Sequence, residues 1–382
     1  TAVTVRDTTS RGYGAGISLA APASGTISGN DVAGNSIALN VQAAFAGAIE
    51  DNDFHHANIG IVHGSGATLS GKRVRDNATG ISSALTGNSA LGFAPGIQPN
   101  EIFRNATGVQ LSGNMQGQHV YQNTTGVSGS GQLVAADLDH ANVIEFNGVG
   151  VNVTGPVQFN RIARNSTGVS AANSQLIAHN LIYRNAQGVH VSGKSDARII
   201  SNTFYTPAGD NVRVANGSRQ VEVRDNILWT ENGYDIYVAN DSVTGFFSDY
   251  NVLHASGAGK VGFWTKDFTD ILDWQEDIYQ FDLHSIGTTV VEPTWSEPQF
   301  FNRAGDDYRV FELLARQRFS SPTVDAGDPL TDLALPADIV NLLDNPSFES
   351  GLTGWTVTPS GVTQNANPAP FEGSAYFAAG PN

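Results

Sequence analysis

Two side chains suited to proton transfer and one cation occupy the same position of a repeated sequence unit. His190, Arg213 and Tyr237 each stand two residues after the bend of a repeat. An imidazole or a phenolate can remove a proton beside a carboxylate, while a guanidinium binds that carboxylate through two hydrogen bonds. We therefore predict His190 or Tyr237 as base and Arg213 as the neutralising cation. The alternative is three polar residues on a solvated sheet with no shared task.

Further candidates for substrate binding lie close to these three in the repeat. Glu222 and Arg224 fall on the strand that follows them, and a second column of the repeat carries Tyr183, continued near Tyr205 and Trp229. Aromatic rings can stack on the faces of sugars, but they are also ordinary strand residues that cover apolar surface beneath loops. Both interpretations remain open for these rings.

The repeat unit is Asn-x-x-Gly followed by Val or Ile. Six clear copies place their glycines 28, 18, 24, 18 and 20 residues apart, at Gly80, Gly108, Gly126, Gly150, Gly168 and Gly188. An earlier asparagine extends several copies to Asn-x-Ile-x-x-Asn-x-x-Gly-Val, as in 160–169 and 180–189. We expect the central Ile to point inward. We expect the Gly and Asn to take left-handed backbone conformations at the bends, and the asparagines of successive repeats to stack along an axis.

This pattern resembles the right-handed parallel β-helix, the fold of pectate lyases and related polysaccharide-active proteins. The resemblance covers residues 1–260 and implies an all-β solenoid. No window sustains the apolar spacing of a helix, whereas short strands at regular turn intervals fit the sequence. With strands about 4.8 Å apart, roughly ten or eleven coils give a rod about 50 Å long.

The composition changes after the repeats, which predicts three parts: β-helix repeats in 1–260, a capping segment in 261–337, and a linker with a further module in 338–382. A solenoid needs a cap because its last coil otherwise exposes strand edges. Within the cap, 270–278 is a candidate short helix. Asp282, His284 and Asp325 are expected to be structural.

The stretch 341–355 resembles the opening strand of jelly-roll carbohydrate-binding modules of the galactose-binding-like class. Too few residues follow it for a complete module. We therefore expect a truncated module and a longer parent protein that carries other modules.

Composition excludes several partners. The formal net charge is -16 and there is no basic run, so nucleic acid and anionic membranes are poor electrostatic matches. No apolar stretch is long enough to cross a membrane. The chain has no cysteine, which excludes disulfides and thiolate metal sites.

The segment 50–56 holds three carboxylates and two imidazoles, but strand alternation sends them to different faces. We expect no metal and no cofactor, with calcium as the open alternative.

Two functional classes remain. One is a secreted or cell-surface bacterial β-helix protein that binds or processes polysaccharide, with a lyase or epimerase on acidic glycans as its catalytic form. The other is a non-catalytic structural or adhesive surface rod, a fragment of a larger extracellular protein. Whether the protein is an enzyme stays open at this point, because the clustered aspartates and the Gly-His-Gly typical of β-helix polygalacturonases are not assembled in the sequence.

Overall fold

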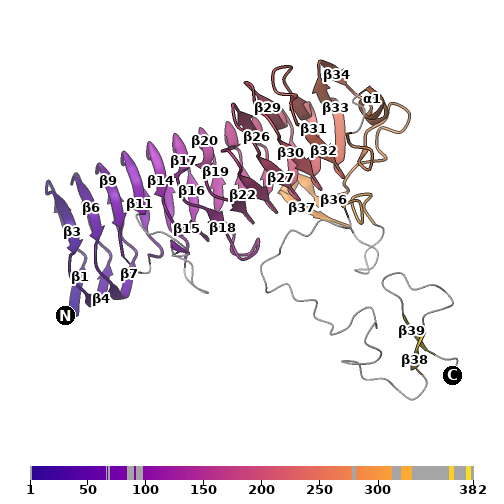
Figure 1. The fold of residues 1–382 in the computed structure, drawn as a ribbon. Coiled ribbons are helices and arrows are strands. Elements are labelled where there is room, and N and C mark those ends of the chain that lie inside the picture. Colours follow the sequence, from indigo (N-terminus) through magenta and orange to yellow (C-terminus); the bar gives the residue numbers. More distant parts are fainter. Residues whose placement is uncertain are drawn as a thin grey trace. The chain divides into compact units, whose positions relative to one another are not determined.

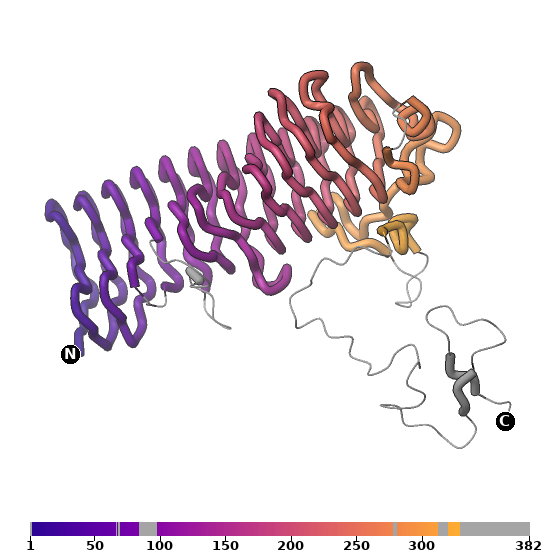
Figure 2. The backbone as a smooth tube through the Cα atoms, in the orientation of Figure 1, coloured from indigo at the N-terminus to yellow at the C-terminus, as the bar shows by residue number. Residues whose placement is uncertain are grey.

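A computed structural model of the 382-residue chain describes residues 2–65, 67, 69–83, 90–91, 98–277, 281–311, 320–328, 361–364 and 376–379. The chain forms two compact units, Thr1–Pro329 and Leu330–Asn382. The first unit is a right-handed parallel β-solenoid of about 11 turns, as predicted (Figure 1). Each coil contributes short strands that pair in parallel with those of its neighbours, so the coils stack along one axis (Figure 2).

The strands of the solenoid fall into three columns. The first column contains β2 (Thr9–Arg11), β5 (Asp31–Ala33), β8 (Asp53–His55), β10 (Arg73–Arg75), β13 (Glu101–Phe103), β16 (His119–Tyr121), β19 (Val143–Glu145), β22 (Arg161–Ala163), β25 (Leu181–Tyr183) and β28 (Thr203–Thr206). The second contains β3 (Ala15–Leu19), β6 (Ile37–Val41), β9 (Ile59–His63), β11 (Thr79–Ser83), β14 (Thr107–Leu111), β17 (Thr125–Gly129), β20 (Val149–Val153), β23 (Thr167–Ser170), β26 (Gln187–Ser192) and β29 (Asp210–Ala215). The long strands β31 (Ile227–Val238) and β33 (Val252–Trp264) continue both columns.

The third column consists of three shorter sheets. They contain β1 (Ala2–Arg6), β4 (Ala23–Ser28) and β7 (Phe45–Glu50); β12 (Ala90–Leu91) and β15 (Asn114–Met115); and β18 (Leu133–Val134), β21 (Val157–Gln158), β24 (Leu176–Ala178), β27 (Arg198–Ile200), β30 (Glu222–Arg224) and β32 (Phe247–Asp249). The sequence predicted that the repeats end at residue 260 and the capping segment begins at residue 261. Strand β33 runs across this predicted boundary.

Stacked apolar side chains fill the interior of the solenoid. The middle residue of each first-column strand points inward, and the following members are fully buried: Val74, Ile102, Val120, Ile144, Ile162, Ile182, Phe204 and Leu228. Burying a side chain of this size contributes about 1.5 to 3 kcal/mol. The inward position predicted for the central Ile of the repeat is therefore confirmed.

Two ladders of side-chain amides run along the axis at the bends. Between the first and second columns, the Asn105 amide Nδ2 donates to Asn123 Oδ1 over 3.0 Å, and Asn123 donates to Asn147 in the same way. Before the first column, Asn160 donates to Asn180 Oδ1 over 3.1 Å, and the series continues through later coils. These bonds confirm the predicted stacking and satisfy polar groups that are buried at every bend.

The repeat glycines have a different role from the predicted one. Non-glycine residues, such as Arg104 (φ 53°) and Arg164 (φ 54°), take the left-handed conformation at the bend, directly before the ladder asparagine. A Cβ atom on Gly108 would lie 2.5 Å from the carbonyl oxygen of Gly126 in the next coil. Glycine is therefore required because the coils approach closely there, and the attribution to left-handed backbone was wrong.

One lysine interrupts the second ladder. Lys72 occupies the position held by Asn52 one coil earlier and by Asn100 one coil later, and its side chain is fully buried. Its Nζ donates to the carbonyl oxygens of Ile49 and, over 3.0 Å, of Ser70. The Nδ2 of Asn52 donates to the corresponding two carbonyls of its own coil and the preceding one. The amine thus replaces an amide, and burial lowers its pKa to about 7.

A short helix closes the last coil. The closing segment comprises β34 (Lys266–Phe268), α1 (Ile271–Asp277), β35 (Ile286–Gly287), β36 (Phe300–Asn302), the 3₁₀ turn Arg303–Gly305 and β37 (Asp307–Val310). Trp274 of α1 is fully buried, and its indole Nε1 donates to Asp282 over 2.8 Å. Asn251 and Ser285 also donate to Asp282, so its predicted structural role and the predicted helix are confirmed.

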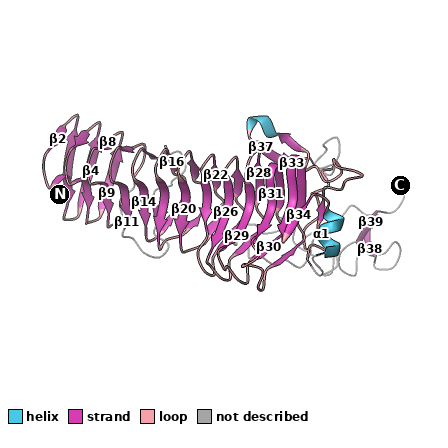
Figure 3. Ribbon diagram, turned by 90° about the horizontal axis from the view of Figure 1, so that it is seen from above, coloured by secondary structure: helices cyan, strands magenta, loops and turns pink. Residues whose placement is uncertain are grey.

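Strands β36 and β37 form an antiparallel hairpin that lies on the outer face of the first column. Figure 3, which views the solenoid from above, shows β37 beside β28 and β31. In the second unit, the described residues form one antiparallel pair, β38 (Gly361–Gln364) with β39 (Tyr376–Ala379). The predicted opening strand at 341–355 lies outside the described residues. No helix in the described part of the chain is both long and apolar enough to span a membrane.

Candidate functional site

A groove of about 930 Å³ lies on the outer face of the first column. Its floor is formed by the first residues of four successive strands, Arg161, Leu181, Thr203 and Ile227, so it runs along the solenoid axis. Since strands are stacked about 4.8 Å apart, four strands give a floor about 14 Å long. The volume is within the range of sites that enclose a ligand of several rings.

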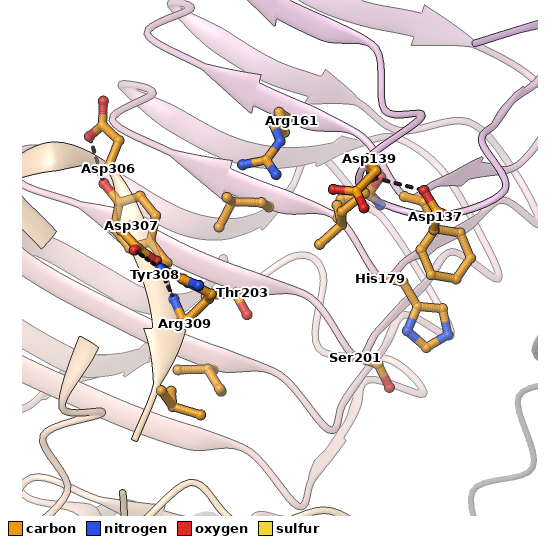
Figure 4. Close-up of a pocket in the computed structure, with 16 residues that line it drawn as sticks. Asp137, Asp139, Arg161, His179, Ser201, Thr203, Asp306, Asp307, Tyr308 and Arg309 are labelled. Carbon is orange, nitrogen blue, oxygen red and sulfur yellow. Dashed lines mark hydrogen bonds and ion pairs between the residues drawn. The ribbon is translucent and has the colours of Figure 1, made fainter. Parts of the chain in front are cut away.

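The two walls of the groove come from segments far apart in the chain. Residues 137–139 of the turn between β18 and β19 form one wall, and β37 with Asp306 forms the other. The turn between β21 and β22 holds only two residues, 159–160, whereas the turn between β18 and β19 holds eight, 135–142. The extra length lets this turn rise above the sheet. Figure 4 shows Asp139 on one wall and Asp307 on the other, with Arg161 between them.

Arg161 is the free cation of the groove. Its side chain is half-buried and, among the described residues, takes part in no ion pair. The other guanidinium of the lining, Arg309, is bound to Asp307 by two contacts of 2.9 and 2.6 Å. This pairing holds the pKa of Asp307 below its ordinary value, to which Arg161 adds a smaller contribution. Arg161 therefore has its donors available for a ligand.

The carboxylates of the groove differ in their partners. Asp137 Oδ1 accepts hydrogen bonds from the backbone N–H groups of Asp139 and His140 and pairs with the His140 ring over 2.6 Å. Asp306 is bound by Arg184 over 2.7 Å and by Arg164, which hold its pKa below the ordinary value despite the opposing effect of burial. Asp139 has an exposed side chain that accepts no hydrogen bond from the described residues. It is the free carboxylate of the groove.

An imidazole lies at the edge of the floor. His179 stacks on Phe159 of the preceding coil, with ring centroids 4.8 Å apart and an angle of 12° between the planes. Burial lowers the pKa of His179, so the ring is neutral near pH 7 and one of its nitrogens can accept a proton or a hydrogen bond. The groove thus combines a free guanidinium, a free carboxylate, a neutral imidazole and apolar floor residues.

The predicted trio of His190, Arg213 and Tyr237 lies in register on the second column, outside this groove. Arg213 stacks 3.8 Å above the Tyr237 ring and pairs with Asp210 over 2.6 Å. Tyr237 in turn stacks on Phe263, 4.6 Å away. Burial, with Arg213 nearby, lowers the pKa of His190. The structure brings the three together as a stack along the axis, in which the guanidinium already has two partners.

Glu222 and Arg224 lie on β30 of the third column. Glu222 pairs with Arg198 over 2.7 Å and with Arg224 over 3.1 Å, and Arg224 also pairs with Asp328 over 3.2 Å. None of these partners belongs to the second column. The expected proximity to Arg213 was wrong, because consecutive strands of one coil face different sides of the solenoid.

Tyr183, Tyr205 and Trp229 lie in register on the first column but are not exposed. Their exposed fractions are 8%, 5% and 5%, because the β36–β37 hairpin covers them with Phe300 and Tyr308. The rings are therefore packed beneath the hairpin and are not exposed to solvent. The alternative, packing beneath a covering segment, is what the structure shows.

Sequence reasoning missed the residues that make the groove, chiefly Arg161, His179, Asp139 and Asp307. One signal was present: the 24-residue interval between Gly126 and Gly150, longer than the 18-residue intervals on either side, contains the turn 135–142. The other wall had no local signal, because β37 follows the groove floor by about a hundred residues. Among the described residues, no group of three or more His, Asp or Glu side chains is placed to hold a metal ion.

The fold and the groove together define a parallel β-solenoid with an open groove along its axis. Comparison of the chain with protein-family models, with curated proteins and with solved structures finds no match of any of the three kinds.

Proposed function

We propose that this protein binds an extended polysaccharide chain in the groove between the turn 135–142 and the β36–β37 hairpin. The observation that carries the proposal is the open groove itself, with a floor about four strands long and the free Arg161 at one end. A linear polymer suits such a site because the groove follows the solenoid axis and is built from one repeat after another.

The lining supports a sugar ligand over an apolar one. Leu181 and Ile227 offer apolar contact for the CH faces of sugar rings, while Thr203 and Ser201 offer hydroxyl groups. Asp139 and His179 can each accept a hydrogen bond from a sugar hydroxyl. Sites that bind small polar molecules commonly combine such apolar walls with a few placed polar groups.

The same proposal covers location and context. A polysaccharide ligand fits a secreted or cell-surface bacterial protein whose β-helix is of the pectate-lyase-like type. It also fits the resemblance of 341–355 to the opening strand of a carbohydrate-binding module. Binding of this kind serves adhesion to the glycan or its processing, and the neutral His179 and the free Asp139 are the groups of the groove suited to proton transfer.

The test is affinity gel electrophoresis of the protein in gels that contain acidic or neutral polysaccharides. The variant Thr203→Trp places a large ring on the groove floor and should abolish retardation. Gln110→Trp, on the exposed face of the second column, is the matched control and should migrate like the native protein.

Two results would contradict the proposal. One is a lack of retardation by every polysaccharide. The other is equal retardation of the native protein and the Thr203→Trp variant, which would place binding elsewhere on the chain. Appearance of unsaturated ends in the same mixtures would add a lyase activity to binding.

A further inference from the structure

We infer that the groove selects a polysaccharide with widely spaced anionic groups over a polyuronate that carries a carboxylate on every sugar. This inference rests on the proposed polysaccharide binding and specifies its substrate class. It follows from how charge is distributed along the groove.

The free positive charge is confined to one strand of the floor. Arg161 lies on β22, and the next three strands present Leu181, Thr203 and Ile227 at the same register position. A sugar unit is about as long as the spacing of strands, about 4.8 Å. A chain that places one carboxylate at Arg161 therefore has several units with no cation opposite them.

One wall of the groove adds negative charge. The lining contains the carboxylates of Asp137, Asp139, Asp306 and Asp307 and the guanidiniums of Arg161 and Arg309. Arg309 compensates Asp307, and Arg164 and Arg184 compensate Asp306, so the excess negative charge rests on Asp137 and Asp139 of the turn 135–142. The whole chain carries a net charge of -16, which deepens the negative field around the groove.

A dense polyanion thus gains one favourable contact at Arg161 and meets the carboxylates of Asp137 and Asp139. Exposed charges act on each other within about 8 to 10 Å at physiological ionic strength, so charges that line one groove affect the same ligand. A chain with one carboxylate in each longer repeat gains the Arg161 contact without the repulsion. A neutral chain avoids the repulsion but lacks the charge-assisted hydrogen bonds.

The experiment compares three probes in affinity electrophoresis at low and physiological salt: polygalacturonate, with a carboxylate on every unit; deacylated gellan, with one carboxylate in each tetrasaccharide; and a neutral β-glucan. We expect gellan to bind most tightly. Arg161→Gln should weaken gellan binding by about tenfold, the value of one charge-assisted hydrogen-bonded contact, and leave glucan binding unchanged. Asp139→Asn should strengthen polygalacturonate binding by removing a nearby like charge.

Arg219→Gln is the matched control, because Arg219 is an exposed arginine of the turn between β29 and β30, away from the groove. It should leave all three affinities unchanged. The inference is overturned if polygalacturonate binds more tightly than gellan, or if Arg161→Gln leaves gellan binding intact while Thr203→Trp abolishes it. In both cases the proposed binding in the groove stands if Thr203→Trp abolishes retardation. If the native protein retains no probe, both the binding and its selectivity are overturned.

Discussion

Replacing the buried Lys72 by asparagine is expected to stabilise the protein near neutral pH. The amine sits in a ladder otherwise built from amides, and its two acceptors are backbone carbonyls that an amide can also reach. In the Lys72→Asn variant, the side-chain oxygen would in addition accept from Asn52, as Asn100 Oδ1 now accepts from the backbone N–H of residue 72 over 3.2 Å. The substitution restores the repeat.

The magnitude follows from the pKa of the amine. Burial lowers it from 10.5 to about 7, while Glu50 and Asp51 oppose this effect. Between these two pH values the unfolded chain binds more protons than the folded chain, so the free energy of unfolding rises with pH. The difference between the two pKa values lowers the free energy of unfolding by about 4 to 5 kcal/mol below pH 7. This cost disappears above about pH 10.5. The asparagine variant has no such cost.

The assay is urea unfolding of both proteins between about pH 6 and pH 10.5, with hydrogen exchange of the coil that contains residue 72 as a local readout. The variant should exceed the native protein by several kcal/mol near pH 6, and the two should converge as the pH rises. Lys194→Asn, in the turn between β26 and β27, is the control for loss of a lysine. A difference between Lys72→Asn and native protein that does not change with pH would refute this reasoning.

Three other substitutions test the remaining parts of the architecture. Asp235 is fully buried, and burial raises its pKa well above 3.8, so stability is lost as the pH rises. Asp235→Asn should remove that slope in urea unfolding between about pH 4 and pH 8, and an unchanged slope would contradict the assignment. Gly108→Ala should lower the free energy of unfolding in urea by about 1 to 3 kcal/mol, because its Cβ would meet a carbonyl oxygen at 2.5 Å. Gly14→Ala, with open space around it, should leave the free energy of unfolding nearly unchanged. Asp306→Asn should lower the free energy of local opening of the hairpin by about 1 to 2 kcal/mol, which hydrogen exchange would detect as faster exchange in residues 300–310. Unaltered exchange would show that the aromatic contacts alone hold the hairpin on the solenoid.

The sequence was enough to predict the solenoid because each coil repeats the same residue types at the same positions. Inward Ile182, the Asn165 ladder position and the close-packed glycine all recur at one spacing, so a single sequence reveals them. Register was equally accessible: His190 and Arg213 are direct partners on neighbouring strands, as predicted.

The groove escaped prediction because it depends on contacts between distant parts of the chain. Arg164 and Asp306 are 142 residues apart, and no periodicity links them. Without the hairpin, Tyr205 and Trp229 would be exposed rings, as the sequence suggested; with it, they become its packing surface. Departures from a repeat, such as the longer turn 135–142, mark where such sites arise.

The position of the hairpin near the end of its unit has a consequence for biogenesis. A chain that leaves the ribosome or a secretion channel N-terminus first can stack every coil before residues 300–310 emerge. Until then the column of Tyr183, Tyr205 and Trp229 is an uncovered apolar strip, and the groove lacks one wall. Arrival of the hairpin removes the strip and completes the groove in one step. The complete groove therefore exists only in chains whose synthesis has passed that point, whereas shorter chains expose the apolar strip and lack one wall of the groove.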